Sequence, residues 1–345
     1  MPYNPTALCG GASEHIGGRS PWPPRPPARE LGRLQRLGSG AQGEEPAHGV
    51  LQPLEDERGR KPAAYAAGMD LESRVALVTG GGGAGTGRAV AVRLASEGAA
   101  VVVADVDPDG GRETVRMIEA AGGRAAFVRS DVTVEPDVRA MVGFAEDTFG
   151  GLDVLVNSAG GTTAPFFPEA PSDHWGRTLD LNLCGPMRAI QHALPAMDRR
   201  GGGAVVNIAS IAGLGTLPNG LAEYAAAKAG LIRLTVTLAS LAERRRVRVN
   251  CVVPDWIAAP AVTARLASLA PADRANVPDQ LTPPEDIAGA VVGFLRDDAL
   301  AGRVLVCWCG HPWALVEDGD VGYREFEVMP APPASVPTNP RAGAG

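Results

Sequence analysis

The sequence lacks any excess of positive charge. Lys and Arg together number 32 against 39 Asp and Glu residues, and the formal net charge is −7 at pH 7. The basic residues are scattered along the chain and form no stripe, so they supply no field that would attract nucleic acid or an anionic membrane. We therefore expect neither nucleic acid nor a membrane as a partner.

Long apolar runs are also scarce. We find no run that approaches the roughly 20 residues needed to span a bilayer. The N-terminal region lacks the apolar core of a secretory signal, and its acidic residues are atypical of a mitochondrial transit peptide. We therefore expect a soluble, cytoplasmic protein.

Cysteine is sparse, and the five cysteines are odd in number and far apart: Cys9, Cys184, Cys251, Cys307 and Cys309. This pattern favours free thiols in a reducing compartment over a disulfide framework. Cys307 and Cys309 alternate within the apolar run VLVCWC, which would place both on one face of a strand, and no second pair of ligands follows them. We expect packing residues here and no metal site.

The two ends of the chain differ in composition from the rest. Residues 1–68 are dense in Pro, Gly and Arg, as in RSPWPPRPPARE, and show no sustained period of 2 or 3.6 residues. We expect a disordered or non-native N-terminal extension there, with Met69 as the natural start. Residues 312–345 are again rich in Pro and Gly, and we expect an irregular C-terminal tail.

Between these ends, residues 69–311 alternate apolar runs with helical patterns. The strand-like run RVALVTG is followed by a glycine cluster and by GRAVAVRLASEG, whose apolar positions recur at three and four, and this order repeats as far as GRVLVCW. Strands this uniformly apolar are buried on both faces, as parallel strands covered by helices are. We predict one α/β domain, a single Rossmann-type doubly wound parallel sheet with helices on both faces.

The glycine cluster TGGGGAGTG joins the first expected strand to its helix. Glycines there allow a tight turn and let backbone amides approach a pyrophosphate at the helix N-terminus, although a flexible surface turn has the same composition. Asp105 ends the next strand, 18 residues beyond Gly87, where a carboxylate can accept hydrogen bonds from ribose hydroxyls or simply cap the strand in solvent. The acid favours NAD over NADP, and Arg88 is the nearest basic residue that could bind a 2′-phosphate instead.

Tyr224 and Lys228 lie four residues apart in EYAAAKAG. On a helix this spacing stacks them on one face, with Cα atoms roughly 6 Å apart. Taken alone, the pattern favours a half-buried tyrosine beside a solvated lysine over a catalytic pair. In a nicotinamide enzyme, the Lys228 ammonium and an oxidised nicotinamide would both favour the Tyr224 phenolate.

A set of motifs in fixed order favours the chemical interpretation. They are TGGGGAGTG, SDVT at 130–133, NSAG at 157–160, LNLCG at 181–185, NIAS at 207–210, YAAAK at 224–228 and RVNCVVPDWIAAP at 248–260. From residue 71 to about residue 306 the chain resembles the short-chain dehydrogenases/reductases. The resemblance implies an NAD(P)-dependent oxidoreductase that acts on CH–OH groups.

The resemblance also implies roles for individual residues. Tyr224 would be the catalytic acid/base, Lys228 its activator, Ser210 the partner of the substrate oxygen and Asn182 the anchor of a water-mediated proton relay. The cofactor contacts that it implies are Gly80, Gly83, Gly85, Thr86, Gly87, Asp105, Asp131, Val132, Asn157, Ala159, Tyr224, Lys228, Pro254 and Ile257.

The chain departs from the family pattern at three places. Four residues separate Gly80 from Gly85, where the family commonly has one fewer. Asp255 and Ala259 stand where a Gly and a Thr are common. The last apolar run ends in CWCGHPW and not in a glycine-paired sequence. These departures concern the phosphate contacts, the region near the nicotinamide and the C-terminal wall of the pocket.

Together these features predict an NAD-dependent oxidoreductase that transfers hydride between nicotinamide and a small secondary alcohol or ketone. The segments 211–220 and 259–280 are expected to border the substrate. The resemblance implies a homotetramer or homodimer, built by the helix of Tyr224 and the helix before it. An alternative is a dinucleotide-binding sensor or scaffold with weakened catalysis. A methyltransferase with a nucleotide-like cofactor would share the glycine loop, but it has no use for the tyrosine and lysine pair.

Overall fold

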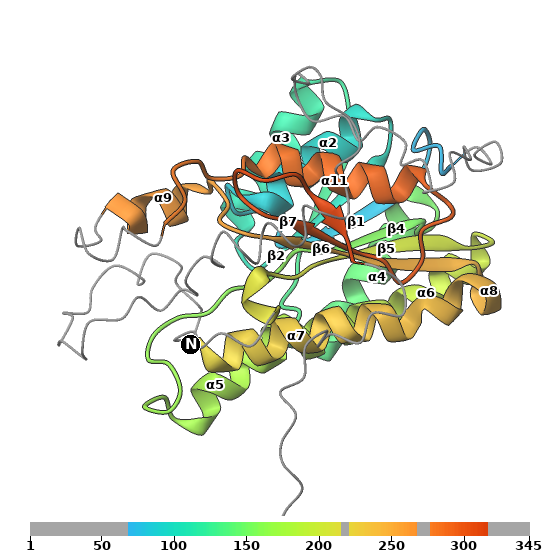
Figure 1. The fold of residues 1–345 in the computed structure, drawn as a ribbon. Coiled ribbons are helices and arrows are strands. Elements are labelled where there is room, and N and C mark those ends of the chain that lie inside the picture. The colour runs from blue at the N-terminus through green and yellow to red at the C-terminus, as the bar shows by residue number, and fades with distance from the viewer. Residues whose placement is uncertain (1–67, 215–220, 268–276, 317–345) are drawn as a thin grey trace, which may run out of the picture.

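A computed structural model of the chain describes residues 68–214, 221–267 and 277–316 (Figure 1). The extension expected over residues 1–68 lies outside this part except for Gly68, and so do residues 317–345 of the expected tail.

The described residues form one eight-stranded sheet in the order β3-β2-β1-β4-β5-β6-β7-β8. The first seven strands in the chain run parallel, and all of these except the edge strand β3 are buried almost throughout. Their bounds are β1 (Val75–Thr79), β2 (Ala100–Asp105), β3 (Arg124–Arg129), β4 (Val154–Asn157), β5 (Gly203–Ile208), β6 (Val247–Pro254) and β7 (Val304–Cys307). The predicted doubly wound parallel sheet is confirmed.

Helices cover both faces of the sheet (Figure 1). One face carries α2 (Thr86–Ser96), α3 (Pro108–Ala120) and α11 (Pro284–Arg296), and the other carries α4 (Glu135–Phe149), α6 (Gly185–Arg199), α7 (Ala222–Thr237) and α8 (Leu241–Arg245). Shorter helical segments are α5 (Ser172–Leu179), η2 (Asp180–Cys184), η3 (Ile211–Gly213), η4 (Leu238–Ser240) and α9 (Pro260–Ala267). Each layer buries its own apolar cluster against the strands, which fixes the helices over the sheet.

The strand order reverses beside β1. This strand pairs with β2 on one side and with β4 on the other, so that Thr79 is aligned with both Ala104 and Asn157. The helix after β1, α2, and the helix that leads from β4 to β5, α6, cover opposite faces, so the carboxyl ends of β1 and β4 lie at a topological switch point. Ligands of open α/β sheets bind at such a reversal.

An eighth strand follows the predicted domain boundary at residue 311. β8 (Ala314–Leu315) runs antiparallel to β7, and Val316 N–H donates a 2.8 Å hydrogen bond to the Val304 carbonyl. A strand of two residues is too short for its alternation to show in the sequence, so the sequence-based boundary omits it. β7 also ends at Cys307, so Cys309 lies in the following turn and not, as expected, on the same strand face.

One helical stretch is more apolar than we expected. Ala222–Arg245 spans 24 residues with a mean hydropathy of 1.3 in its most apolar part, so by length and composition alone it could cross a bilayer. Our expectation that no run approaches this length was wrong, because alanines raise the hydropathy between widely spaced charges. The stretch carries Tyr224 and Lys228 and packs against β6, as a core helix of an α/β domain does, so it is weak evidence for a membrane span.

Candidate active site

Tyr224 lies in the first turn of α7 and faces the end of β5. Its phenol is hydrogen-bonded to the Ser210 hydroxyl, and the Ser210 Oγ also accepts a 3.2 Å hydrogen bond from Ala212 N–H. Burial raises the pKa of Tyr224 to about 12, although the bond to Ser210 acts in the opposite direction. The phenol therefore holds its proton at neutral pH. This direction is opposite to the sequence argument, which weighed the nearby positive charges and not the cost of burying a phenolate.

Lys228 lies one turn further along the same face of α7. Its Nζ is 5.6 Å from the centre of the Tyr224 ring and donates a 2.9 Å hydrogen bond to the Ile208 carbonyl. Burial lowers the pKa of Lys228 to about 8, and the charge interaction with Cys251 raises it in part. The ammonium is therefore the main form at pH 7, although the pKa lies closer to this pH than the pKa of a solvated lysine does.

Asn182 lies in the π-helical segment η2 and is fully buried. Its Oδ1 accepts a 2.9 Å hydrogen bond from Gly161 N–H, and its Nδ2 donates to the carbonyls of Gly161 at 2.7 Å and Thr178 at 2.9 Å. The side chain is thus held by the backbone on both sides. Single π-turns within helices are frequent at functional sites.

Gly160 leaves a gap between Asn182 and Lys228. A Cβ at this position would lie 2.8 Å from Asn182 Oδ1 and 3.1 Å from Lys228 Nζ. The two polar atoms therefore lie close to Gly160 and no more than about 6 Å apart. The structure brings Ser210, Tyr224, Lys228 and Asn182 to one end of the sheet, while their catalytic roles remain predictions.

The glycine loop connects β1 to α2 by a close turn. Gly80 has φ +70, and a Cβ there would lie 2.7 Å from the Ala159 Cα, while a Cβ on Gly87 would lie 2.2 Å from the Gly80 carbonyl oxygen. Both positions require glycine. The additional residue of the loop is accommodated at its tip, where Gly83 and Ala84 are exposed and Gly85 N–H donates to the Gly83 carbonyl at 2.8 Å.

The first turn of α2 fits an anionic group. Its N-cap is Gly85, and among the described residues no side chain caps the turn, which begins with Thr86 and Gly87. Uncapped amides at a helix N-terminus can donate to a phosphate, and the helix dipole favours negative charge there. The loop and this turn therefore fit the pyrophosphate of a dinucleotide.

Asp105 ends β2 beside the glycine loop. Its Oδ2 accepts a 2.8 Å hydrogen bond from Gly82 N–H, and its Oδ1 accepts a 2.9 Å bond from Asp107 N–H. These bonds orient the carboxylate, and each oxygen keeps a further lone pair that could accept a ribose hydroxyl. Arg88 is already engaged, since its guanidinium donates to the Gly82 carbonyl and to Thr114 Oγ1.

The other predicted cofactor residues also lie at the carboxyl ends of strands. Asp131 follows β3 and accepts hydrogen bonds from the Thr133 amide at 2.9 Å and hydroxyl at 2.7 Å. Val132 beside it is buried. Pro254 ends β6, and Ile257 forms an isolated bridge with Thr282.

Asn157 and Ala159 lie at the end of β4 and complete this set. The Asn157 Nδ2 donates a 2.8 Å hydrogen bond to Asn207 Oδ1, and the Ala159 amide donates a 3.2 Å bond to Thr79 Oγ1. Asn207 in turn donates to Thr235 Oγ1 at 2.9 Å. The sequence analysis missed Thr79, Asn207 and Thr235 as supports of the site, although a polar residue inside an apolar strand, as in AVVNIAS, is a usable signal.

Glu223 is a further residue that the sequence analysis missed. Its side chain is buried next to Tyr224, and its Oε2 accepts a 3.3 Å hydrogen bond from Phe167 N–H. Within the described residues, Oε1 has no hydrogen-bond partner. Glu223 thus ties the segment between β4 and α5 to the helix that carries Tyr224.

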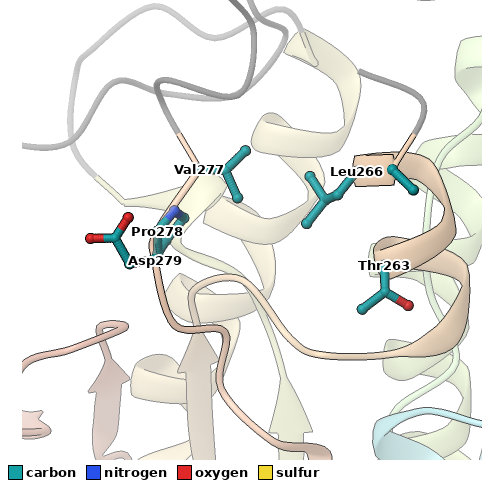
Figure 2. Close-up of a pocket in the computed structure, with 6 residues that line it drawn as sticks. Thr263, Leu266, Val277, Pro278 and Asp279 are labelled. Carbon is teal, nitrogen blue, oxygen red and sulfur yellow. The ribbon is translucent and has the colours of Figure 1, made fainter. Parts of the chain in front are cut away.

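A hollow of about 390 Å³ opens between α9 and the segment 277–279 (Figure 2). It is lined by Thr263, Leu266, Ala267, Val277, Pro278 and Asp279. Figure 2 shows Leu266 and Thr263 on the α9 side, with Val277, Pro278 and Asp279 across the gap. These residues belong to one of the two segments expected to border the substrate. In the other segment, residues 215–220 lie outside the described part of the chain.

Residues 74–269 match the short chain dehydrogenase family. The chain belongs to this family, and it is an oxidoreductase whose relatives act on hydroxyl groups. The family uses nicotinamide cofactors, which the glycine loop and Asp105 fit.

Three similar proteins illustrate the family. A cyclohexanol dehydrogenase from Acinetobacter sp. is 36% identical over 66% of this chain and 90% of its own length. The 3beta-hydroxysteroid dehydrogenase 1 of Eggerthella lenta is 38% identical over 67% and 89%. A solved 7 alpha-hydroxysteroid dehydrogenase, complexed with NADH and 7-oxo glycochenodeoxycholic acid, is 30% identical with a TM-score of 0.65, covering 70% of this chain and 94% of its own.

Proposed function

We propose that this protein is an NAD-dependent dehydrogenase or reductase that transfers hydride between nicotinamide and a secondary alcohol or its ketone. The observation that carries the proposal is the arrangement of Tyr224, which bonds Ser210 and lies one helical turn from the buried Lys228. No relative described above favours the alternative of a sensor or scaffold.

Proton transfer is the part of the reaction that the chain itself performs. Ser210 holds the substrate oxygen by a hydrogen bond, and Tyr224 donates a proton to that oxygen when a ketone is reduced. In oxidation the same phenol accepts the proton, with the Lys228 ammonium offsetting part of the cost of a buried phenolate. The bound nicotinamide supplies or accepts the hydride.

The gap at Gly160 supports a path for the proton beyond Tyr224. A water between Lys228 Nζ and Asn182 Oδ1 could bond both atoms, because they lie no more than about 6 Å apart next to Gly160. Asn182 is fixed by its backbone bonds, so it would orient that water with little loss of side-chain freedom. This assigns Asn182 the anchoring role that the family resemblance implies.

The preference for NAD rests on Asp105 and Arg88. The Asp105 carboxylate would repel a 2′-phosphate, and Arg88, the nearest basic residue, is bonded to the glycine loop and to Thr114. Binding of NADP would require the Asp105 side chain to move away from the 2′-phosphate and Arg88 to be released from its hydrogen bonds. We therefore expect NAD(H) to be used with higher efficiency than NADP(H).

Cyclic secondary alcohols are the substrate class that the similar proteins favour. Their printed names include cyclohexanol and steroid dehydrogenases. The hollow beside α9 offers Leu266 and Val277 as apolar contacts, with Thr263 and Asp279 at its margin. An uncharged ring compound fits such a lining better than a highly charged substrate does.

We also propose a homo-oligomer, built through α7, in the cytoplasm. Six of the exposed positions on this helix and its continuation follow one stripe at spacings of four and three, and four of them are small: Ala222, Ala226, Ala229, Arg233, Val236 and Ser240. Only 28% of the most apolar 18 residues of this stretch are buried within one chain. A second copy packed on the stripe would cover the remainder by close helix approach.

The decisive experiment is Tyr224→Phe, assayed at the nicotinamide absorbance on a panel of cyclic and open-chain secondary alcohols and ketones. Positioned proton transfer is typically worth about 10² to 10⁴ in rate, so turnover should fall by this factor while cofactor binding stays near that of the wild type. Thr237→Val, which removes an exposed hydroxyl from the same helix, is the matched control. Retention of more than about a tenth of the activity in Tyr224→Phe would refute the proposed role.

A further inference from the structure

The segment from Asp255 to Ala259 follows β6 and contains Ile257, one of the proposed cofactor contacts. It is held on one side by a short ladder with Thr282. Thr282 N–H donates to the Trp256 carbonyl at 2.8 Å, and Ala258 N–H donates to the Thr282 carbonyl at 2.8 Å. The ladder fixes the middle of the segment against residues close to α11.

The other side of the segment is held by the turn after β7. Asp255 N–H donates a 3.0 Å hydrogen bond to the Cys307 carbonyl, and Asp255 Oδ2 accepts a 3.3 Å bond from Cys309 N–H. The Cys309 thiol donates to the Trp256 carbonyl at 3.2 Å and lies 3.3 Å from Thr282 Oγ1. Cys309 is only 6% exposed, so these bonds have little competition from water.

Two of the departures from the family pattern are therefore partners in space. Asp255 stands where a glycine is common, and Cys309 belongs to the unusual ending CWCGHPW. A glycine at 255 would offer no carboxylate to the Cys309 amide. The thiol stays protonated and able to donate, because burial raises the pKa of Cys309.

The segment also lies close to the glycine loop. The methyl group of Ala259 lies 3.5 Å from the position that a Cβ on Gly85 would occupy. A shift of the segment would thus move both Ile257, a proposed cofactor contact, and Ala259, which lies beside the loop expected to hold the pyrophosphate. Tight packing transmits such shifts because interiors have few voids to absorb them.

We propose that Asp255 and Cys309 are positioning residues for the dinucleotide. They clamp the segment 255–259 between the β7–β8 turn and Thr282, so that Ile257 and Ala259 are in place before the cofactor arrives. The clamp reduces the conformational entropy that the segment would otherwise lose when the dinucleotide binds. This inference rests on the proposed function, since it assumes that a dinucleotide binds at the carboxyl ends of the strands.

The test compares Asp255→Ala and Cys309→Ala with the conservative variants Asp255→Asn and Cys309→Ser. Asn retains an acceptor for the Cys309 amide, and Ser retains a donor in place of the thiol. NADH dissociation constants are measured by fluorescence, with thermal melting as a check on folding. We expect each alanine variant to weaken NADH binding and raise the cofactor KM roughly tenfold, with kcat within about threefold, and the conservative variants to recover most of the loss.

A double variant and a variant of a cysteine outside the clamp complete the comparison. Because Asp255 and Cys309 act on the same segment, the combined alanine variant should lose little more than either single variant. Cys184→Ala, which removes a half-buried thiol outside the clamp, should leave NADH binding unchanged.

Folded alanine variants that bind NADH as tightly as the wild type overturn the clamp. If those variants do not fold, Thr282→Val decides, because it removes only the hydroxyl partner of Cys309 and should weaken NADH binding severalfold. Unchanged binding in Thr282→Val overturns the proposal as well. A wild-type protein that binds neither NADH nor NADPH refutes the proposed function and the clamp together, whereas tight wild-type binding with unaffected variants refutes the clamp alone.

Discussion

Gly160→Ala is a sharp test of the gap between Lys228 and Asn182. The added methyl carbon would lie 2.8 Å from Asn182 Oδ1 and 3.1 Å from Lys228 Nζ, closer than ordinary contact. Neither side can retreat easily, because Asn182 is held by bonds to Gly161 and Thr178, and Lys228 by its bond to the Ile208 carbonyl.

The size of the effect follows from this crowding. Overpacking of a well-packed site costs about 1 to 3 kcal/mol. If the cost falls on the transition state, each 1.36 kcal/mol is a factor of ten in rate, so kcat/KM should fall about 5- to 150-fold. The methyl group also presses on the two atoms that would bind the proposed water, so the loss should appear mainly in kcat.

The assay is steady-state turnover on the best substrate of the panel, with pH profiles and melting temperatures for each variant. Gly143→Ala is the control, since within the described structure nothing lies within 4 Å of its added methyl group and it sits inside α4. A Gly160→Ala protein whose kcat/KM stays within about twofold of the wild type would show that the gap has no part in catalysis.

Three further outcomes are expected. Asp105→Asn keeps an acceptor but removes a charge whose repulsion of a 2′-phosphate is worth about 1 to 4 kcal/mol, so the ratio of NADP to NAD efficiency should rise at least about fivefold; an unchanged ratio contradicts this role. The Lys228 ammonium is present below its pKa of about 8 and is lost as the pH rises through that value, so kcat/KM for ketone reduction should decline there. A profile of kcat/KM that is flat from pH 7 to 10 would contradict this role of the Lys228 ammonium. Val236→Arg should convert an oligomer into a monomer in light scattering, because Val236 is 38% exposed on the stripe of α7, and a wild-type monomer at micromolar concentration would remove the proposed interface.

Local periodicity explains how much of the fold could be predicted. The spacing of apolar residues along the chain predicts the alternation of buried strands and helices. The face shared by Tyr224 and Lys228 depends only on helix geometry. The acid at the end of β2 was also recognisable, since its place relative to the glycine loop is set by one βα unit. These features require no knowledge of distant contacts.

The features that could not be predicted depend on contacts between residues that are far apart in the sequence. Asn182 meets Gly161 across 21 residues, Glu223 meets Phe167 across 56, and Cys309 meets Asp255 across 54. The sequence marked Asp255 and the CWC ending as separate departures, and only the pairing of β6 with β7 brings them into contact. Their partnership is a property of the sheet and not of either segment.

The sequence by itself determined which chemical groups are present and in what local order, down to the tyrosine and lysine on one helical face. The tertiary structure decided their proton affinities, since burial raises the pKa of Tyr224 to about 12 and lowers that of Lys228 to about 8. It also placed Gly160 next to Asn182 and Lys228 and supplied the hydrogen bonds that hold the side chains of the site. The physical reason is that helix and strand periods act over a few neighbouring residues, whereas desolvation and packing depend on which distant segments fold against a group.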